Sequence, residues 1–332
     1  MAAVPEKMKA WQYVQYGGGA GSLELVDKPV PRPGPDEILL KIHASSVNPV
    51  DWKIQSGALK AVIWIKLPMV PGTDFAGTVA AVGSNIAGFS VGDRILAKVD
   101  VYHQGAFAEY GVIDTKTIAR LPPGVSFEDA AGLPVAAMTA LQGLIKGGLS
   151  FPKGTGRVLV QAASGGVGHY AVQLAKYAGA HVTATASTGN IDLVKSLGAD
   201  EVLDYKKLAD PANPFQSASK QPYDVILHCT SKEEPWDHWQ KVLAKHGKVV
   251  SFTPGASYIA RSALQAATFS KQRLIPLILS ANSKDLQTLV DLVGDKKLKT
   301  VIDSKYPLSE AKKAWERSID GHSVGKVVVV AE

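Results

Sequence analysis

The sequence RVLVQAASGGVGHYAVQLAKYAG, residues 157–179, decides the fold of much of the chain. A short apolar run typical of a strand ends in a glycine-rich turn, after which apolar residues recur at helical spacing. In that turn Ala163, Gly165 and Gly168 stand at the three glycine positions of the pattern G-x-G-x-x-G. Because strand precedes the turn and helix follows it, the stretch predicts a dinucleotide-binding unit whose turn holds a pyrophosphate.

The segment after the next predicted strand bears on the choice of dinucleotide. An Asp or Glu about 20 residues beyond the glycines normally binds the ribose 2′-hydroxyl of NAD. Here the strand at residues 181–186 runs into Ser187-Thr188-Gly189-Asn190, which contains no acid. The small polar residues leave room for a 2′-phosphate and favour NADPH. Four nearby residues are candidate partners of that phosphate, or ordinary solvated surface residues: Lys195, Tyr205, Lys206 and Lys207.

Length and composition describe an ordinary globular protein. The 332 residues suggest two domains, and 46% hydrophobic with 20% charged residues argues against disorder. The net charge of +6 comes mainly from lysine, with 29 Lys and only 7 Arg spread along the chain. Diffuse lysine favours solubility or an anionic membrane surface and argues against a nucleic-acid partner. The single cysteine, Cys229, excludes an intramolecular disulfide and a four-cysteine zinc lobe.

The remaining chain divides into a β-rich front and an alternating back. Residues 9–44 predict an antiparallel opening, with MKAWQYV and EILLKIHAS separated by a proline-rich turn. Strand-like runs at 180–186, 201–203, 224–228, 248–252 and 274–279 alternate with helical stretches, as in a doubly wound parallel sheet. A helix at 309–318 and a strand at 326–330 are predicted to rejoin the front domain. The expected domains are residues 1–124, 125–283 and the returning segment 284–332.

The order of these parts resembles the medium-chain dehydrogenase/reductase superfamily, and within it the zinc-free quinone oxidoreductase branch. The resemblance rests on SVNPVDWK at 46–53, PGTDFAG at 71–77, GAFAEY at 105–110, LPVAAMTAL at 133–141 and AASGGVGHYAVQLAK at 162–176. Plant chloroplast envelope quinone oxidoreductase homologues look most similar, through SLGADEVLDYK at 196–206, LKTVIDSK at 298–305 and SIDGH at 318–322. The resemblance implies an α/β protein with a GroES-like, mostly β catalytic domain and a Rossmann domain.

The resemblance also implies site residues. Zinc alcohol dehydrogenases need a thiolate and an imidazole at turns that here carry Asn48 and Gly72-Thr73-Asp74, so we expect no metal site. The implied NADPH contacts are Asn48, Thr139, Ser164, Gly165, Gly166, Val167, Gly168, Ser187, Asn190, Tyr205, Thr253 and Lys326. Relatives tend to carry Arg before Asn190, whereas this chain has Gly189, which opposes the NADPH preference. Thr139 also fits a hydroxyl satisfied by its own helix.

Two residues are candidate proton donors, and Lys53 is also a candidate cofactor contact. Lys53 lies on the turn that carries Asn48, and Tyr102 lies in the loop before GAFAEY. The alternative is that both are ordinary cleft or surface residues and that water donates the proton. His169, beside Gly168, is interpreted as a packing residue.

The expected activity is transfer of hydride from NADPH, without a metal, to the C=C bond of enones, alkenals or γ-ketols, or to quinones. The alternative is a low-turnover NADPH-binding protein that serves as a structural component or membrane-associated sensor. We expect no cleavable targeting peptide, and a place at the chloroplast envelope by resemblance, with a cytoplasmic or stromal enzyme as the alternative.

Two contacts with partners are also predicted. The run at 274–279 is expected at a sheet edge, where a second copy would extend the sheet into a homodimer. The run Val62-Ile63-Trp64-Ile65 between Lys60 and Lys66 is too short to span a bilayer but suits a peripheral membrane wedge. A place in the core or in the wall of the substrate cleft is the alternative for these four residues.

Overall fold

A computed structural model describes residues 4–207 and 214–331. The chain forms two compact units: unit 1 comprises residues 1–138 and 281–332, and unit 2 comprises residues 139–280. The first division therefore falls later than residue 124, where the sequence suggested it. The reason is that helix α2 (Phe127–Ala131), expected to open the second domain, packs against β3 (Glu37–Val47) and β4 (Asp74–Val82) of unit 1.

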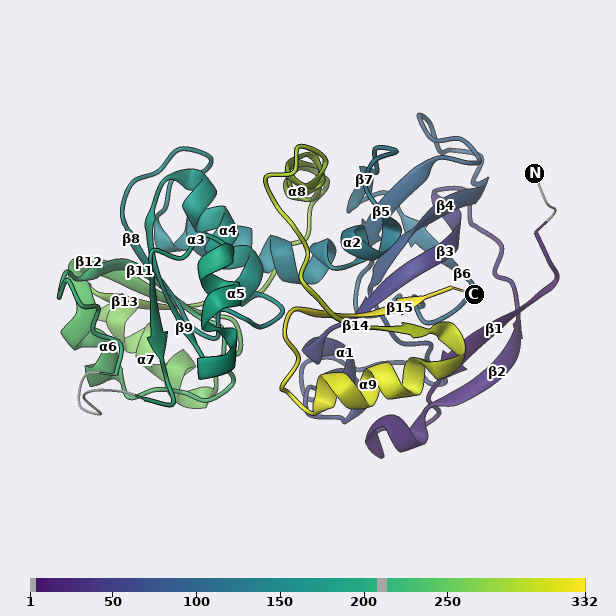
Figure 1. Cartoon of the computed structure of the whole chain (residues 1–332). Coiled ribbons are helices and arrows are strands. Elements are labelled where there is room, and N and C mark those ends of the chain that lie inside the picture. The colour runs from purple at the N-terminus through teal and green to yellow at the C-terminus, as the bar shows by residue number, and fades with distance from the viewer. Residues whose placement is uncertain (1–3, 208–213, 332) are drawn as a thin grey trace. The chain divides into compact units, whose positions relative to one another are not determined.

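Unit 2 is built on a six-stranded, all-parallel sheet in the order β10-β9-β8-β11-β12-β13 (Figure 1). The strands are β8 (Arg157–Val160), β9 (His181–Ala186), β10 (Glu201–Asp204), β11 (Tyr223–His228), β12 (Leu243–Ser251) and β13 (Arg273–Pro276). Chain order runs outward in both directions from β8, which confirms the predicted doubly wound sheet. In such sheets ligands bind beyond the carboxyl ends of the strands where the order reverses, here between β8 and its neighbours.

Four helices connect strands of this sheet: α4 (Gly168–Ala178), α5 (Ile191–Ser196), α6 (Trp236–Val242) and α7 (Ala256–Ala267). Helix α3 (Met138–Gly147) precedes β8. Helix α4 contacts β8 and β9, whereas α7 contacts β13. Helix α4 ends at Gly179, whose φ of 101° allows its backbone N–H to return to the carbonyl of Ala175. A buried aromatic group around Trp239, with Phe215 stacked on it, fills the core beneath β11 and β12.

The edge position predicted for the last strand of this sheet is confirmed, but the strand is shorter than expected. Strand β13 ends at Pro276 rather than reaching residue 279, and pairs on one side with β12. Proline lacks a backbone N–H, so it suits an edge strand. Ile278, beyond the strand end, is almost fully exposed. The pairing of two copies along this edge stays a prediction.

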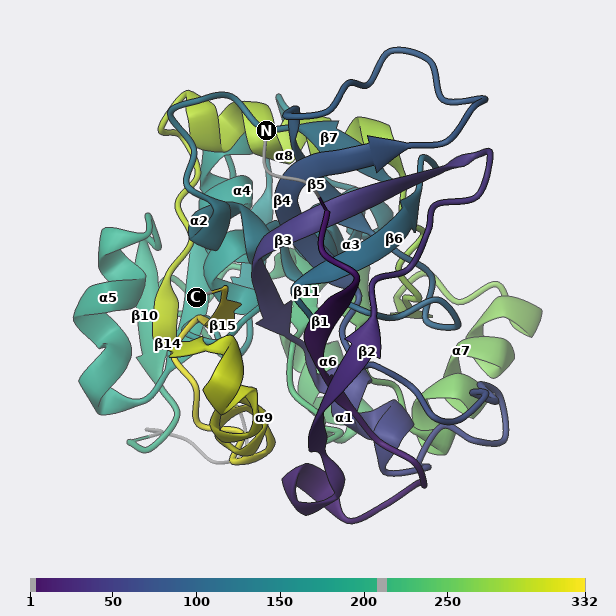
Figure 2. The same cartoon turned by 90° about the vertical axis from the view of Figure 1, so that its right-hand side faces the viewer.

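Unit 1 contains a seven-stranded, mainly antiparallel sheet with the order β14-β15-β3-β4-β5-β7, in which β6 also pairs with β3 (Figure 2). Besides β3 and β4, its strands are β5 (Arg94–Lys98), β6 (Tyr110–Asp114), β7 (Ile118–Arg120), β14 (Ile302–Pro307) and β15 (Lys326–Val330). Because β15 pairs antiparallel with β3, the tail rejoins the front of the chain, as the sequence predicted.

The first strand finds a different partner from the one the sequence suggested. Strand β1 (Lys7–Gln12) pairs with β2 (Glu24–Pro29) in a separate two-stranded sheet, and EILLKIHAS instead forms the start of β3 in the large sheet. The segment ELVDKP was not recognised as a strand. Its residues alternate between exposed and half-buried, so it lacks the apolar run by which the other strands were found.

Helices complete unit 1: α1 (Pro49–Gln55), α8 (Ser283–Gly294) and α9 (Ala311–Ile319). A π-helical turn, Leu133–Ala137, lies between α2 and α3. Helix α9 packs on β14 and β15, where Trp315 is buried edge-to-face against Phe107. This packing holds strand β15 in place, and Lys326 is the first residue of that strand.

Candidate active site

The glycine-rich turn has the geometry of a phosphate loop. A β-carbon at Gly168 would lie 2.2 Å from the carbonyl oxygen of Ala162, so this position admits only glycine. At Gly165 the nearest atom would be the same oxygen at 3.3 Å, so glycine there leaves the backbone open to a ligand. The turn leads directly into α4, and the first N–H groups of a helix have no partner within it. Gly165, Gly166 and Val167 therefore form the kind of turn that binds anions at a helix N-terminus, and their contact with a pyrophosphate stays a prediction.

The end of β9 carries the predicted ribose region. Asn190 donates a hydrogen bond from Nδ2 to the Ser164 hydroxyl at 3.2 Å, and its backbone N–H donates to the carbonyl of Ser187. The structure thus brings three predicted cofactor contacts together on one small surface.

An acid that the sequence interpretation missed lies beside this surface. Asp204, at the end of β10, accepts a hydrogen bond of 2.6 Å from the Thr188 hydroxyl. That bond is the main reason why the pKa of Asp204 lies below its usual value. The dinucleotide-binding pattern places the acid at the end of β9. Asp204 comes instead from the neighbouring strand β10, where it pairs with Ala186. Its charge opposes a 2′-phosphate.

The other predicted contacts of unit 2 are dispersed. Tyr205 is half exposed after β10, and Thr253 follows β12, where its hydroxyl donates to the carbonyl of Thr230 at 2.8 Å. Thr139 is buried in the first turn of α3. His169 is fully buried with Nδ1 2.9 Å from the carbonyl oxygen of Gly165, in agreement with the packing role expected for it.

Unit 1 contains a buried polar cluster around Asn48, at the start of α1. The Asn48 side chain donates to Asp74 Oδ2 at 2.8 Å and accepts from Lys326 Nζ at 2.6 Å. Asp74 Oδ2 also accepts from the Ser46 hydroxyl, and Asp51 Oδ2 accepts from the Asn48 backbone N–H, each at 2.8 Å. These five residues come from β3, α1, β4 and β15. We call Ser46, Asn48, Asp51, Asp74 and Lys326 the Asn48 cluster.

Burial shifts the titration of every charged member. Burial, together with the Asp74 carboxylate, raises the pKa of Asp51 to about 7. Burial also raises the pKa of Asp74, against the opposing effects of Lys326 and of the hydrogen bonds from Asn48 and Ser46. The pKa of Lys326 is lowered by burial, which its two acidic neighbours counteract. Two buried carboxyl groups thus lie within electrostatic range of one buried ammonium group.

The predicted proton donors lie in more open surroundings. Lys53, in the last turn of α1, is half-buried, and its pKa is lowered by that burial. Its ammonium lies 5.7 Å from the ring centre of Trp52. Tyr102 is half exposed in the loop after β5, where its backbone N–H donates to Asp100. Both roles remain proposals.

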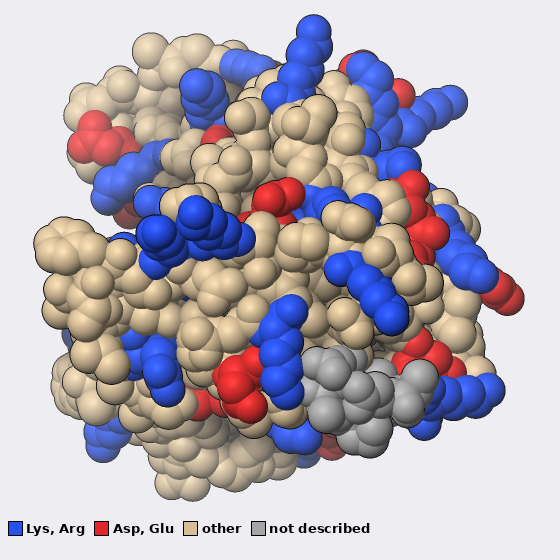
Figure 3. Space-filling view, turned by 90° about the vertical axis from the view of Figure 1, so that its left-hand side faces the viewer, with Lys and Arg blue, Asp and Glu red and all other residues tan. Residues whose placement is uncertain are grey.

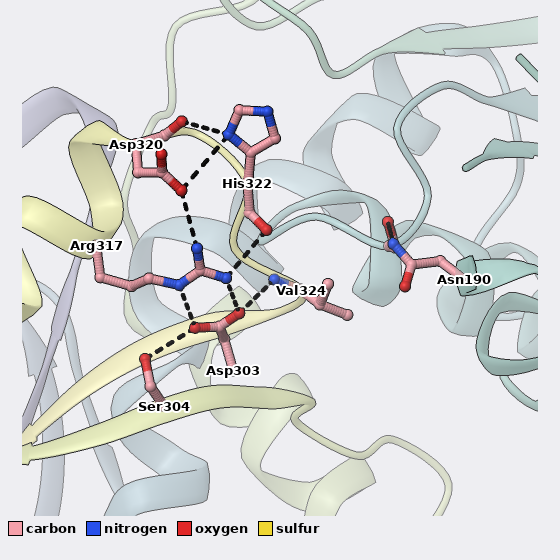
Figure 4. A network of polar contacts seen from close by, with 8 residues as sticks. Asn190, Asp303, Ser304, Arg317, Asp320, His322 and Val324 are labelled. Carbon is pink, nitrogen blue, oxygen red and sulfur yellow. Dashed lines mark hydrogen bonds and ion pairs between the residues drawn. The ribbon is translucent and has the colours of Figure 1, made fainter. Parts of the chain in front are cut away.

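A clamp fixes the segment that leads to Lys326 (Figure 4). Arg317 of α9 binds both oxygens of Asp303 in β14, at 2.7 and 2.8 Å, and a third bond joins Arg317 to Asp320. Asp303 also accepts from the backbone N–H of Val324 at 2.8 Å. Burial alone would raise the pKa of Asp303, but the hydrogen bonds from Arg317, Val324 and Ser304 together with the Arg317 charge outweigh it and lower that pKa. The stretches VIDSK and SIDGH, singled out separately in the sequence, are therefore joined through one arginine.

The donor set at the two turns does not suit zinc. Zinc in proteins is held by thiolate, imidazole and carboxylate ligands, whereas the two turns carry Asn48 and Gly72-Thr73-Asp74, which offer neither a thiolate nor an imidazole. Both side-chain atoms of the Asn48 amide are already bound within the cluster. Among residues 4–207 and 214–331, no group of three or more His, Cys, Asp or Glu is arranged to hold a metal ion.

Comparison with known proteins shows to which family the chain belongs. Family models described as "Alcohol dehydrogenase GroES-like domain" and "Zinc-binding dehydrogenase" match residues 34–123 and 197–329. The chain is 48% identical to a chloroplast envelope quinone oxidoreductase homolog of Arabidopsis thaliana, over 97% of this chain and 98% of that one. It is 35% identical to an NADPH-dependent alkenal/one oxidoreductase of the same plant, a chloroplastic protein, over 99% of this chain and 81% of that one. A quinone oxidoreductase structure from Coxiella burnetii matches with a TM-score of 0.84 and 32% identity, covering 98% and 100% of the two chains.

Fold, phosphate loop and these likenesses together define a nicotinamide-dependent oxidoreductase of the medium-chain dehydrogenase/reductase superfamily. More narrowly, the chain belongs to that superfamily's quinone oxidoreductase family. The predicted resemblance, the GroES-like and Rossmann parts and the enzyme class are confirmed.

Proposed function

We propose that the protein is an NADPH-dependent reductase of α,β-unsaturated carbonyl compounds or quinones. The observation that carries the proposal is the phosphate loop, in which Gly165 leaves the backbone open at the start of α4. The identity to quinone oxidoreductase homologues and to an alkenal/one oxidoreductase supports both acceptor classes. The cofactor supplies a hydride, and the acceptor takes up a proton besides. Asn48, Thr139, Thr253 and Lys326 remain the proposed nicotinamide-side contacts.

The residues favour an acceptor that needs no metal. An alcohol substrate would have to lose a hydroxyl proton during oxidation, for which a zinc ion is the usual aid. An enone or a quinone needs only stabilisation of the negative charge that develops on its oxygen. We propose Lys53 and Tyr102 for that role or for protonation, because both are polar, accessible and outside the hydrogen-bonded Asn48 cluster.

Steady-state oxidation of NADPH with a panel of 2-alkenals, γ-ketols and quinones tests the proposal. We expect acceptor-dependent turnover with at least one class. NADPH binding without turnover across the panel would favour the alternative, a low-turnover NADPH-binding structural protein or membrane-associated sensor. Absence of binding would contradict both functions.

The choice between NADPH and NADH is set by opposing groups near Asn190. Gly189 borders open space, since a β-carbon added there would have no other atom within 4 Å, so an arginine side chain fits at this position. Because its guanidinium binds a phosphate through two N–H groups, Gly189→Arg is expected to tighten NADPH binding about tenfold. NADH binding should change little. Fluorescence titration with both dinucleotides measures the effect.

A matched variant tests the acid beside this surface. Asp204→Asn keeps the shape of the side chain but removes a charge that repels the 2′-phosphate, so it should also favour NADPH over NADH. Equal changes for both dinucleotides in the two variants would contradict a 2′-phosphate site at this place.

We propose in addition that the protein is chloroplastic and binds peripherally at the envelope membrane. The relatives named above support the first part, since they are described as chloroplast proteins. Within the described residues, every helix falls short of the length and apolar character needed to cross a bilayer. Figure 3 shows Lys and Arg spread over one whole face of the molecule with Asp and Glu between them, a diffuse charge that suits weak attraction to anionic lipid.

The predicted wedge is only partly available for membrane contact. Val62 is 74% exposed and Trp64 is 67% exposed, whereas Ile65 is 1% exposed and belongs to the interior. The expectation that all four apolar residues face the membrane is therefore wrong for Ile65. Two exposed apolar side chains between Lys60 and Lys66 remain as the proposed anchor.

Cosedimentation with anionic liposomes tests this anchor. Bound protein is expected to fall as salt is added, and to fall again, about threefold, in Trp64→Ser, because an indole at the interface contributes about 1 kcal/mol or less when only part of it is buried. Phe269→Ser removes another exposed aromatic residue, in unit 2, and serves as the control that should bind like the wild type. Binding that neither salt nor Trp64→Ser changes would favour a cytoplasmic or stromal enzyme.

A further inference from the structure

The Asn48 cluster has a charge imbalance that the proposed reductase does not yet use. Asp51 and Asp74 have exposures of 0%, and Lys326 is 3% exposed. If both carboxyl groups were ionised, one buried negative charge would remain without compensation, which is costly in a protein interior. A single proton on the carboxyl pair makes the cluster neutral.

The hydrogen bonds favour ionisation of one carboxyl group over the other. Asp74 Oδ2 accepts bonds from Ser46 and Asn48, both of which stabilise its ionised form. Asp51 accepts one bond, from the Asn48 backbone N–H, and the Oδ1 atoms of both carboxyl groups are buried without a hydrogen-bond partner among the described residues. Asp74 is thus the better carboxylate, and Asp51 the better carboxylic acid.

Other titratable groups face Asp51 from each neighbouring element. Lys326 comes from β15, Asp74 from β4 and Lys98 from β5, and all three act on its titration. The phenol of Tyr13, after β1, lies within electrostatic range of Asp51 and is likewise buried without a hydrogen-bond partner among the described residues. On α1 itself, Lys53 occupies the more exposed last turn.

We propose that Asp51 is a positioning residue that holds one proton at neutral pH and so sets the charge of the cluster that orients Asn48. The protonated cluster is neutral, and loss of the proton makes it singly negative beside the Asn48 amide. This inference rests on the proposed function in one respect, namely that the nicotinamide binds at Asn48. Oxidised nicotinamide is cationic and reduced nicotinamide is neutral, so the negative cluster favours the oxidised cofactor.

The proton itself can be measured without any cofactor. Infrared spectroscopy of the protein at pH 5 to 9 is expected to show the C=O band of a buried carboxylic acid, which disappears as the pH rises through about 7. Asp51→Asn should lack this band, whereas Asp51→Glu should retain one at a shifted position. A wild-type spectrum without such a band, or an unchanged band in Asp51→Asn, would overturn the proposal.

Stability gives a second readout. The pKa of Asp51 is higher in the folded protein than in the unfolded chain, so between about pH 4 and 7 the folded state binds more protons. The contribution of Asp51 to stability is therefore complete at low pH and is lost as the pH rises through about 7. The urea midpoint of Asp51→Asn should therefore rise relative to that of the wild type as the pH increases from about 4 to 7. A constant difference between Asp51→Asn and the wild type across this interval would count against the proposal.

Cofactor affinity tests the link to the nicotinamide. From pH 6 to 8 the wild type is expected to bind NADP⁺ more tightly relative to NADPH, by a factor on the order of tenfold for one charge near the ring. In Asp51→Asn the ratio should stay constant. An infrared band that behaves as expected together with a constant wild-type ratio would overturn the link to the nicotinamide, and the turnover assay would still decide the reductase function independently.

Discussion

Replacing Lys326 by methionine is expected to lower the free energy of unfolding by about 3–5 kcal/mol at neutral pH, the usual cost of leaving a buried charge without compensation. Lys326 Nζ donates to Asn48 Oδ1 at 2.6 Å and to the carbonyl of Val47 at 3.2 Å. Methionine fills much of the same volume but leaves Asp74 and Asp51 without a buried cation. Urea denaturation followed by circular dichroism measures the loss.

Two further variants show whether charge causes the loss. Lys305→Met removes a half-exposed lysine 3.6 Å from Glu128 and should cost less than about 1 kcal/mol. In Lys326→Met/Asp74→Asn one buried negative charge is removed with the cation, so part of the lost stability should return. If Lys326→Met were as stable as Lys305→Met, the ammonium would not be compensating the carboxyl pair.

Gly165→Asp is expected to weaken dinucleotide binding at least a hundredfold, about 2.7 kcal/mol. The new β-carbon would lie 3.3 Å from the Ala162 carbonyl oxygen, which is a tight contact in the turn that we propose binds the pyrophosphate. The carboxylate adds a negative charge at the start of α4, where the site is built for an anion. Fluorescence titration with NADPH measures binding, and circular dichroism should show that the fold persists.

A second aspartate separates position from charge. Gly124→Asp adds the same group in open space within unit 1 and should bind NADPH like the wild type. Equal affinity in Gly165→Asp would mean that the turn is not the phosphate site. The neighbouring Gly168 is a poorer test of binding, because any side chain there would meet the Ala162 carbonyl at 2.2 Å and disturb the fold itself.

The sequence predicted the parallel sheet of unit 2 well because its strands are apolar runs separated by helical periodicity. Strands β9, β10 and β11 begin within one residue of their predicted starts. Strand β2 was not predicted, because both of its faces are largely accessible and its sequence has no apolar pattern. The domain boundary was placed early because a proline-rich break at residues 121–124 looks like a linker, although the helix that follows still packs on unit 1.

Within the site, local motifs were predictable and long-range pairings were not. The glycines of the phosphate loop follow one another in the sequence, so their pattern is visible there. The partnership of Asp51 and Asp74 with Lys326 joins residues more than 250 positions apart, which no local pattern reports. The role of Asp204 was not predicted for a similar reason, since its place beside Thr188 depends on how β10 pairs with β9.

The position of β15 has a consequence for the order in which the enzyme forms during translation. Unit 2 is a contiguous segment, residues 139–280, so the ribosome delivers all of it before residue 281 is made. The large sheet of unit 1, in contrast, waits with residues 44–47 of β3 unpaired on one side until residues 326–330 emerge and insert between β3 and β14. Lys326 arrives with that strand, so Asp51 and Asp74 have no buried cation until then. Nascent chains therefore pass through a stage in which the dinucleotide-binding half is complete while the other half still offers an open strand edge to chaperones.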